Sequence, residues 1–156
     1  LKGLDRLDDR IVLIATTNLY DYFDKALLRR FDSIISFNRY TREDLLGIAE
    51  KMLDQYLVKF KLANRDIRIF RKIMNLLEEM PYPGDLKNII KTAVAFSDPA
   101  DGQDYFRRLY YGVCGYAPED IKLLQEQKFT VREIEILTKK SKSSVSRLLK
   151  EVETSE

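Results

Sequence analysis

The chain has 156 residues, of which 45% are hydrophobic and 33% charged, so it carries enough apolar material for one or two globular cores and is not a disordered segment. Its 27 basic and 25 acidic residues give a net charge of +2, which argues against a polyanion-binding surface over the whole molecule. The sequence has no histidine and one cysteine, Cys114. These counts exclude imidazole general bases, Ser/His and Cys/His nucleophile pairs, familiar zinc sites and an internal disulfide.

The cellular compartment is the next property that the composition restricts. No apolar run reaches the roughly 18 residues that a membrane-spanning helix needs, and the first ten residues lack the apolar segment of a signal peptide. We therefore expect a soluble, cytoplasmic protein with no membrane partner. The chain begins without an initiator methionine and almost at once enters a predicted strand, so we also expect a further portion to precede it.

Two short apolar runs near the start predict β-strands. Residues 11–15 are continuously apolar and rich in β-branched side chains, as expected of a central strand buried on both faces. Residues 34–37 predict a second strand, and residues 24–30 between them predict a short helix. The polar triplet Thr16-Thr17-Asn18 follows the first strand, where open α/β sheets bind ligands. The alternative is that Asn18 only caps the next turn.

From Thr41 onward the apolar residues recur at three- and four-residue steps, which predicts helices. Residues 98–102, with the sequence Asp-Pro-Ala-Asp-Gly, predict a linker between them. The predicted helices or their apolar stripes cover residues 41–57, 69–77, 86–94, 105–110 and 118–125.

The last segment predicts two short helices joined by a tight turn. Residues 130–133 form a capping box, in which a threonine hydroxyl and a glutamate carboxylate satisfy backbone amides at a helix start. Ile134 and Leu137 form one apolar face, residues 138–141 form the turn, and a second apolar face follows it. Two short helices joined in this way have the geometry of a helix-turn-helix. Residues 129–150 carry six cations and two anions, a net charge of +4.

Three cationic side chains are candidates for phosphate recognition. Arg29 and Arg30 directly follow the predicted short helix, and arginine suits planar, multidentate phosphate contacts. The alternative for this pair is surface salt bridges. Lys87 lies in the first turn of its helix, where the helix dipole favours anions, so it either meets an external anionic partner or is simply solvated.

The order and spacing of these features over about residues 10–96 resemble the second half of an AAA+ ATPase module. The features are the apolar run ending in Asn18, residues 24–32, the predicted strand at 34–37, the helix from Thr41, and Pro83-Gly84-Asp85-Leu86-Lys87-Asn88.

The resemblance implies a role for each of four side chains. Asn18 corresponds to sensor one, which positions the attacking water and reports the γ-phosphate. Arg30 corresponds to the arginine finger that reaches the nucleotide of a neighbouring subunit, with Arg29 as the alternative finger. Lys87 corresponds to sensor two on the helical lid, where family members usually carry arginine. The resemblance also implies a homo-oligomer that uses ATP and Mg²⁺.

Two motifs of an ATPase are missing from the sequence. It contains neither a G-x-x-x-x-G-K-[ST] loop nor an apolar strand ending in Asp-Glu, the groups that hold phosphates and Mg²⁺. In the family both precede the sensor-one strand. We therefore expect this chain to be the C-terminal part of a longer ATPase, inactive alone and without a metal site of its own, with ATP and Mg²⁺ held mainly by the other half.

Residues 133–134 and 141–149 resemble the helix-turn-helix of bacterial DNA-binding regulators. Between them the chain departs from the pattern, with Glu135 where alanine is usual and Lys139 where glycine commonly makes the turn. The apolar residues of the second helix face inward, which leaves small hydroxyls and cations to meet bases and phosphates. The predicted DNA-binding residues are Lys142, Ser143, Ser146, Arg147 and Lys150. The alternative is a helix-turn-helix that serves only protein docking or extends the lid.

The predicted architecture is mainly α, with a C-terminal fragment of an α/β AAA+ core (two strands and one helix), a helical lid and a helix-turn-helix domain. The predicted boundaries are 1–40 for the core fragment, 41–97 for the lid, 98–128 for a helical linker region and 129–156 for the helix-turn-helix. The predicted function is ATP binding and hydrolysis as an oligomer, coupled to DNA binding or remodelling. Two alternatives remain: a DNA-binding transcription regulator with a non-hydrolysing ATPase-like switch, and a protein-interaction adaptor.

Overall fold

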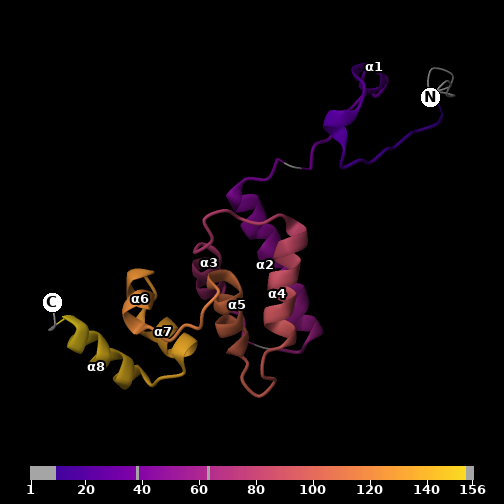
Figure 1. The fold of residues 1–156 in the computed structure, drawn as a ribbon. Coiled ribbons are helices and arrows are strands. Elements are labelled where there is room, and N and C mark those ends of the chain that lie inside the picture. The colour runs from indigo at the N-terminus through magenta and orange to yellow at the C-terminus, as the bar shows by residue number, and fades with distance from the viewer. Residues whose placement is uncertain (1–9, 38, 63, 154–156) are drawn as a thin grey trace. The chain divides into compact units, whose positions relative to one another are not determined.

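The structure, a computed structural model, describes residues 10–37, 39–62 and 64–153 (Figure 1). The chain divides into two units, residues 1–39 and residues 40–156. Residues 1–9 of the predicted core fragment and residues 154–156 of the predicted helix-turn-helix domain lie outside the described residues. Every regular element that the structure describes is a helix.

The first unit contains two short helical turns in its described part. They are a 3₁₀ turn, η2 (Tyr20–Tyr22), and a one-turn helix, α1 (Lys25–Leu28). Asp24 begins α1, because its carboxylate accepts a hydrogen bond from the backbone N–H of Ala26 at 2.9 Å. The predicted helix at 24–30 is thus confirmed, in a shorter form.

The two predicted strands are wrong, and with them the predicted α/β core fragment of two strands and one helix. Residues 11–15 and 34–37 form no strand with any residue that the structure describes. The large apolar side chains of these segments, from Ile11 to Phe37, are 46–84% and 52–75% exposed, respectively. A continuous apolar run forms a buried strand only when neighbouring strands pair with its backbone and helices cover both faces. The described part of the first unit supplies neither partner.

The second unit confirms the helical part of the prediction. Its first four helices, which we call the four-helix unit, are α2 (Arg42–Lys59), α3 (Ile67–Met74), α4 (Pro83–Ala95) and α5 (Asp104–Cys114). The next three helices, which we call the C-terminal module, are α6 (Ile121–Glu126), α7 (Val131–Thr138) and α8 (Lys142–Glu153).

Local sequence signals explain where these helices begin. Thr41 caps α2 in a capping box with Asp44, whose pKa is lowered by the hydroxyl and backbone N–H of Thr41. Asp66 caps α3 and Asp120 caps α6, each through its side-chain oxygen. Pro83 occupies the first position of α4, where its missing N–H removes no helical hydrogen bond.

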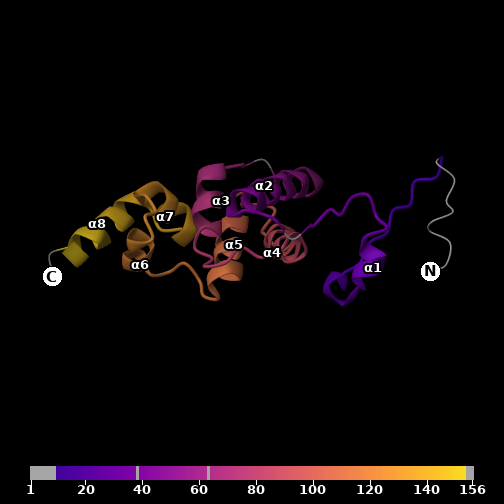
Figure 2. The same cartoon turned by 90° about the horizontal axis from the view of Figure 1, so that it is seen from above.

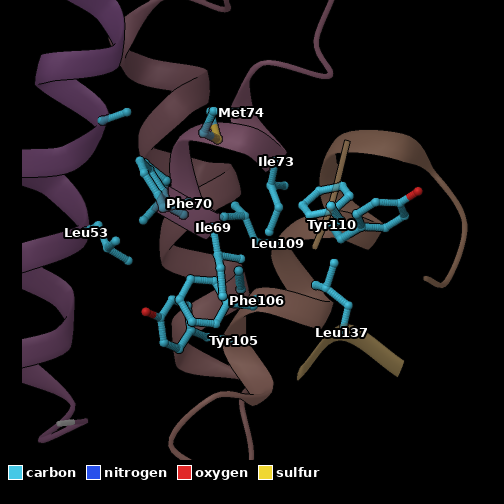
Figure 3. Packing of buried hydrophobic residues seen from close by; sticks show 14 of the residues in the cluster. Leu53, Ile69, Phe70, Ile73, Met74, Tyr105, Phe106, Leu109, Tyr110 and Leu137 are labelled. Atoms are coloured by element: carbon cyan, nitrogen blue, oxygen red, sulfur yellow. The ribbon is translucent and has the colours of Figure 1, made fainter. Parts of the chain in front are cut away.

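The helices of the second unit pack around one hydrophobic cluster. α4 packs against both α2 and α5, α3 packs against α5 and α2, and α7 packs against both α5 and α8 (Figures 1 and 2). The cluster continues from the four-helix unit into the C-terminal module. Figure 3 draws part of it, with Tyr105, Phe106, Leu109 and Tyr110 from α5 and Leu137 from α7, all of them buried. The predicted segments 41–97, 98–128 and 129–156 therefore belong to one compact unit.

A charged side chain also bonds to the backbone carbonyls that follow α3. The guanidinium of Arg42 donates hydrogen bonds to the carbonyls of Leu77 (2.7 Å), Glu78 (3.2 Å) and Asn75 (3.3 Å), just past the end of α3. These carbonyls need partners because the helix has ended.

No helix among the described residues is long and apolar enough to cross a bilayer.

Candidate functional site

The helix α8 has one buried and one solvent-facing side. Val145 and Leu149 are buried in the shared cluster, where α8 packs against α6 and α7. The five predicted DNA-binding side chains lie on the other side, within an arc of about 140° at 3.6 residues per turn. Ser146 is half-buried among them, and the remaining four, Lys142, Ser143, Arg147 and Lys150, are exposed. The structure therefore brings all five onto one face.

Arg147 on this face forms a weak ion pair. Its Nε lies 3.8 Å from Oε1 of Glu151, and both side chains are largely exposed. A long, solvent-screened pair of this kind contributes little and is exchanged easily for another anion. Arg147 is thus able to contact an external phosphate.

Glu135, the first departure from the helix-turn-helix pattern, caps α8. The backbone N–H of Lys142 donates a hydrogen bond to Glu135 Oε1 at 3.1 Å, and the N–H of Ser144 donates to the Ser141 hydroxyl at 3.3 Å. A carboxylate is favourable there because the helix dipole places partial positive charge at this end. It also takes the place that a phosphate would occupy at the helix start. Phosphate contacts of α8 are therefore left to side chains.

Lys139, the second departure, takes the left-handed conformation that favours glycine and ends α7. Its φ is 58°, and its backbone N–H donates to the carbonyl of Glu135 at 2.9 Å. Its ammonium lies 2.8 Å from Asp101 Oδ2 and 3.5 Å from Asp104 Oδ1. Hydrogen bonding to Asp101 raises the pKa of Lys139. One of the six cations of segment 129–150 is thus paired inside the protein.

Two further polar contacts join α7 to the four-helix unit. Arg107 Nε donates to the carbonyl of Leu137 at 2.8 Å. Lys72 Nζ donates to Glu133 Oε2 at 2.6 Å and to the carbonyl of Lys128 at 2.9 Å. Burial disfavours the charge of Glu133, but Lys72 and the groups of Thr130 outweigh it and lower the pKa of that carboxyl.

Sequence reasoning missed these contacts, since their partners lie far apart along the chain. Lys72 and Glu133 are 61 residues apart, and Arg107 and Leu137 are 30 residues apart. The capping box at Thr130, which depends on neighbours in sequence, was predicted and is confirmed.

The residues assigned to nucleotide sensing are all exposed. Asn18 lies before η2, Arg29 follows the last residue of α1 as its cap, and Arg30 comes next in the chain. Lys87, in the second unit, is exposed on α4. Their roles remain predictions.

A Mg²⁺ site needs several oxygen ligands close together. No three carboxylate, cysteine or histidine side chains among the described residues come together as a metal site requires. No protein-family model, curated protein or solved structure matches the sequence, so similarity assigns neither family nor function.

Proposed function

We propose that the C-terminal module binds DNA through the exposed face of α8, as the second helix of a helix-turn-helix. The observation that carries this proposal is the single polar face of α8, with three cations and two serine hydroxyls set over a fully packed apolar side. A helix held in this way presents the side chains that the major groove accepts.

The chemistry of the face divides between two tasks. Lys142, Arg147 and Lys150 supply positive charge for phosphates, and Ser143 and Ser146 are short enough for the backbone to approach base edges. Glu135 at the start of the helix repels a phosphate there, so affinity depends on the cations along the helix.

The test is the salt dependence of binding to a labelled duplex, measured with the full chain. Each phosphate contact contributes about 0.9 to the slope of log affinity against log salt. We expect Lys142→Gln with Arg147→Gln to flatten the slope by about 1.8. The matched control is Lys51→Gln with Lys59→Gln, two exposed cations on α2, and we expect it to leave the slope unchanged.

Two results would contradict the proposal. If both variant pairs flatten the slope equally, binding is a general charge attraction and not a property of α8. If the wild-type chain shows no salt-dependent binding, the C-terminal module is better explained as a protein-interaction adaptor.

We propose a second, separate function, that the first unit and α4 contribute phosphate-contacting cations to an oligomeric ATPase. The observation that favours it is the exposure of Arg29 and Arg30 after a helix that Asp24 caps, together with the resemblance of these segments to an AAA+ module. The predicted role of Asn18 relied on a preceding strand that is not seen, so Asn18 supports this function less than the arginines do. ATP and Mg²⁺ would be held mainly outside these residues.

The test of this second function is the rate of ATP hydrolysis. It is measured in a protein in which a P-loop and an apolar strand ending in Asp-Glu precede this chain. Arg30→Ala is expected to lower ATP hydrolysis by about 10³–10⁵-fold, the usual contribution of an arginine finger. Lys25→Ala removes an exposed cation at the start of α1 and should leave turnover unchanged. Equal turnover of the wild-type protein and Arg30→Ala excludes the finger role, and a loss on Arg29→Ala alone transfers it to that residue.

A further inference from the structure

We propose that Lys139 is a positioning residue that fixes the turn between α7 and α8 to the four-helix unit, so that α8 is presented in one orientation. In the sequence Lys139 is one of six cations of residues 129–150 and stands where glycine commonly makes the turn. Its partners in the structure are two carboxylates, Asp101 and Asp104. The effect of Lys139 on DNA binding rests on the proposed function, whereas its effect on the orientation of α8 does not.

The carboxylates that hold Lys139 are themselves fixed. Asp104, with a side chain only 8% exposed, accepts hydrogen bonds from Arg108 Nε at 2.7 Å and from the backbone N–H of Asp98 at 3.0 Å. Asp101 accepts from the backbone N–H of Gln103 at 3.0 Å. A buried carboxylate with several donors is a rigid anchor, because moving it would leave charge unpaired. The ammonium of Lys139 therefore docks onto a preformed acidic site.

The backbone conformation of Lys139 is not what assigns it this role. Lys139 adopts a positive φ of 58°, a conformation in which a side chain is disfavoured and glycine is not. Lys61 and Lys128 adopt the same conformation, with φ of 57° and 67°, so the backbone alone does not set Lys139 apart. The proposal rests on the two carboxylates that its ammonium contacts at 2.8 and 3.5 Å.

Lys139 acts together with two other contacts along α7. Lys72 holds Glu133 in the first turn, and Arg107 holds the carbonyl of Leu137 in the last turn. Lys139, the residue that follows the helix, is held by Asp101. Attachment at both ends of α7 restricts rotation of the C-terminal module on the four-helix unit. The face of α8 is thus oriented by residues that do not contact DNA.

Electrostatics agree with this geometry. The hydrogen bond from Lys139 lowers the pKa of Asp101, with help from the N–H of Gln103. Burial opposes ionisation of Asp104, but hydrogen bonds from Arg108 and the N–H of Asp98 and the charges of Arg108 and Lys139 outweigh it, so its pKa is also lowered. Both carboxylates remain charged near neutral pH and available to the ammonium.

Distances between spin labels test the orientation without DNA. Labels at Lys91→Cys on α4 and Ser143→Cys on α8, in a Cys114→Ser background, report how the two parts of the second unit sit. We expect one narrow distance for the otherwise unchanged chain and for Lys139→Arg, which keeps the charge. Lys139→Asn keeps a residue that tolerates the left-handed backbone but removes the ammonium, and Asp101→Asn removes its partner; both should broaden or shift the distance.

The control and the contradicting results are specific. Lys140→Gln removes the neighbouring exposed charge and should leave the distance unchanged. A narrow, unshifted distance in both Lys139→Asn and Asp101→Asn overturns the proposal.

The salt slope of DNA binding gives a second, independent readout. Lys139→Asn should weaken binding by about two- to fivefold, the equivalent of an exposed ion pair, with no change in slope. A slope flatter by about 0.9 would show that Lys139 contacts a phosphate and would overturn the proposal. If the wild-type chain does not bind DNA, the proposed function fails, and the label distances still decide whether Lys139 positions the module.

Discussion

The shared hydrophobic cluster predicts that the C-terminal module and the four-helix unit unfold together. Leu137 tests this most sharply, because it is fully buried on α7 in the cluster that also contains Leu109 and Tyr110 of α5. Leu137→Ala removes three carbons from this site and leaves a cavity that the surrounding helices fill only in part. Such substitutions cost about 3 kcal/mol, within a range of about 2–5 kcal/mol.

That cost converts into a measurable melting shift. The second unit spans residues 40–156, and a domain of this size has an unfolding entropy of about 0.25 kcal/mol/K. A loss of about 3 kcal/mol therefore lowers Tm by about 12 °C. We expect one transition in both calorimetry and far-ultraviolet circular dichroism for this unit, shifted as a whole. The control is Val58→Ala on α2, where the side chain is 80% exposed, with an expected shift of about 2 °C or less.

Two outcomes would refute the shared core. One is a pair of separate transitions in which only the smaller, corresponding to the C-terminal module, moves with Leu137→Ala. The other is a shift as small as that of the Val58 control, which would mean that Leu137 is not packed in the folded protein.

Two further predictions concern the capping box of α7 and the carboxylates of Glu133 and Asp104. Thr130→Ala removes half of the capping box, in which the Thr130 hydroxyl accepts a hydrogen bond from the N–H of Glu133 at 3.4 Å. We expect it to lower the free energy of unfolding by about 1 kcal/mol in a denaturant titration. The control Thr92→Ala, on the exposed side of α4, should cost less, and equal losses would contradict the role of the cap. Acid should destabilise the second unit, because the pKa values of Glu133 and Asp104 are lowered on folding. The two ionised carboxylates contribute fully to the free energy of unfolding well above their ordinary pKa values of 4.5 and 3.8, and this contribution is lost as the pH falls below those values. Lys72→Met with Asp104→Asn should flatten this fall between about pH 5 and pH 3, and an undiminished fall would assign it to other groups.

The sequence was sufficient to predict the helices of the second unit because their signals are local. Thr41, Asp120 and Thr130 each precede an apolar stripe of helical period, and each begins a helix in the structure. The face of α8 was predictable for the same reason, since an angle of about 100° per residue determines which side chains share a side. Burial of Val145 and Leu149 then fixes which side is left for solvent.

The strands failed for the opposite reason. An apolar run such as 11–15 specifies burial on both faces but not the neighbours that would provide it, and strand pairing depends on those neighbours. Among the described residues of the first unit no sheet partner is present, and the run is exposed.

The tasks of Glu135 and Lys139 were also beyond the sequence. Both were visible as departures from the helix-turn-helix pattern, and neither departure revealed what the side chain contacts. Glu135 finds its partner across the turn, in the N–H of Lys142. Lys139 finds its partners in Asp101, which precedes α5, and in Asp104, the first residue of α5. Contacts of this kind depend on how helices pack, which local pattern does not determine.

The most direct test of the central claim is a nuclear magnetic resonance titration of the isotope-labelled full chain with a short DNA duplex. The account predicts that the largest shift changes fall on Lys142, Ser143, Ser146, Arg147 and Lys150 and on the turn before them, and that they disappear as salt is added. Exposed cations of α2 should stay unmoved. Changes centred on another surface, or none at a salt concentration where duplex is in excess, would contradict the assignment of α8 as a DNA-binding helix.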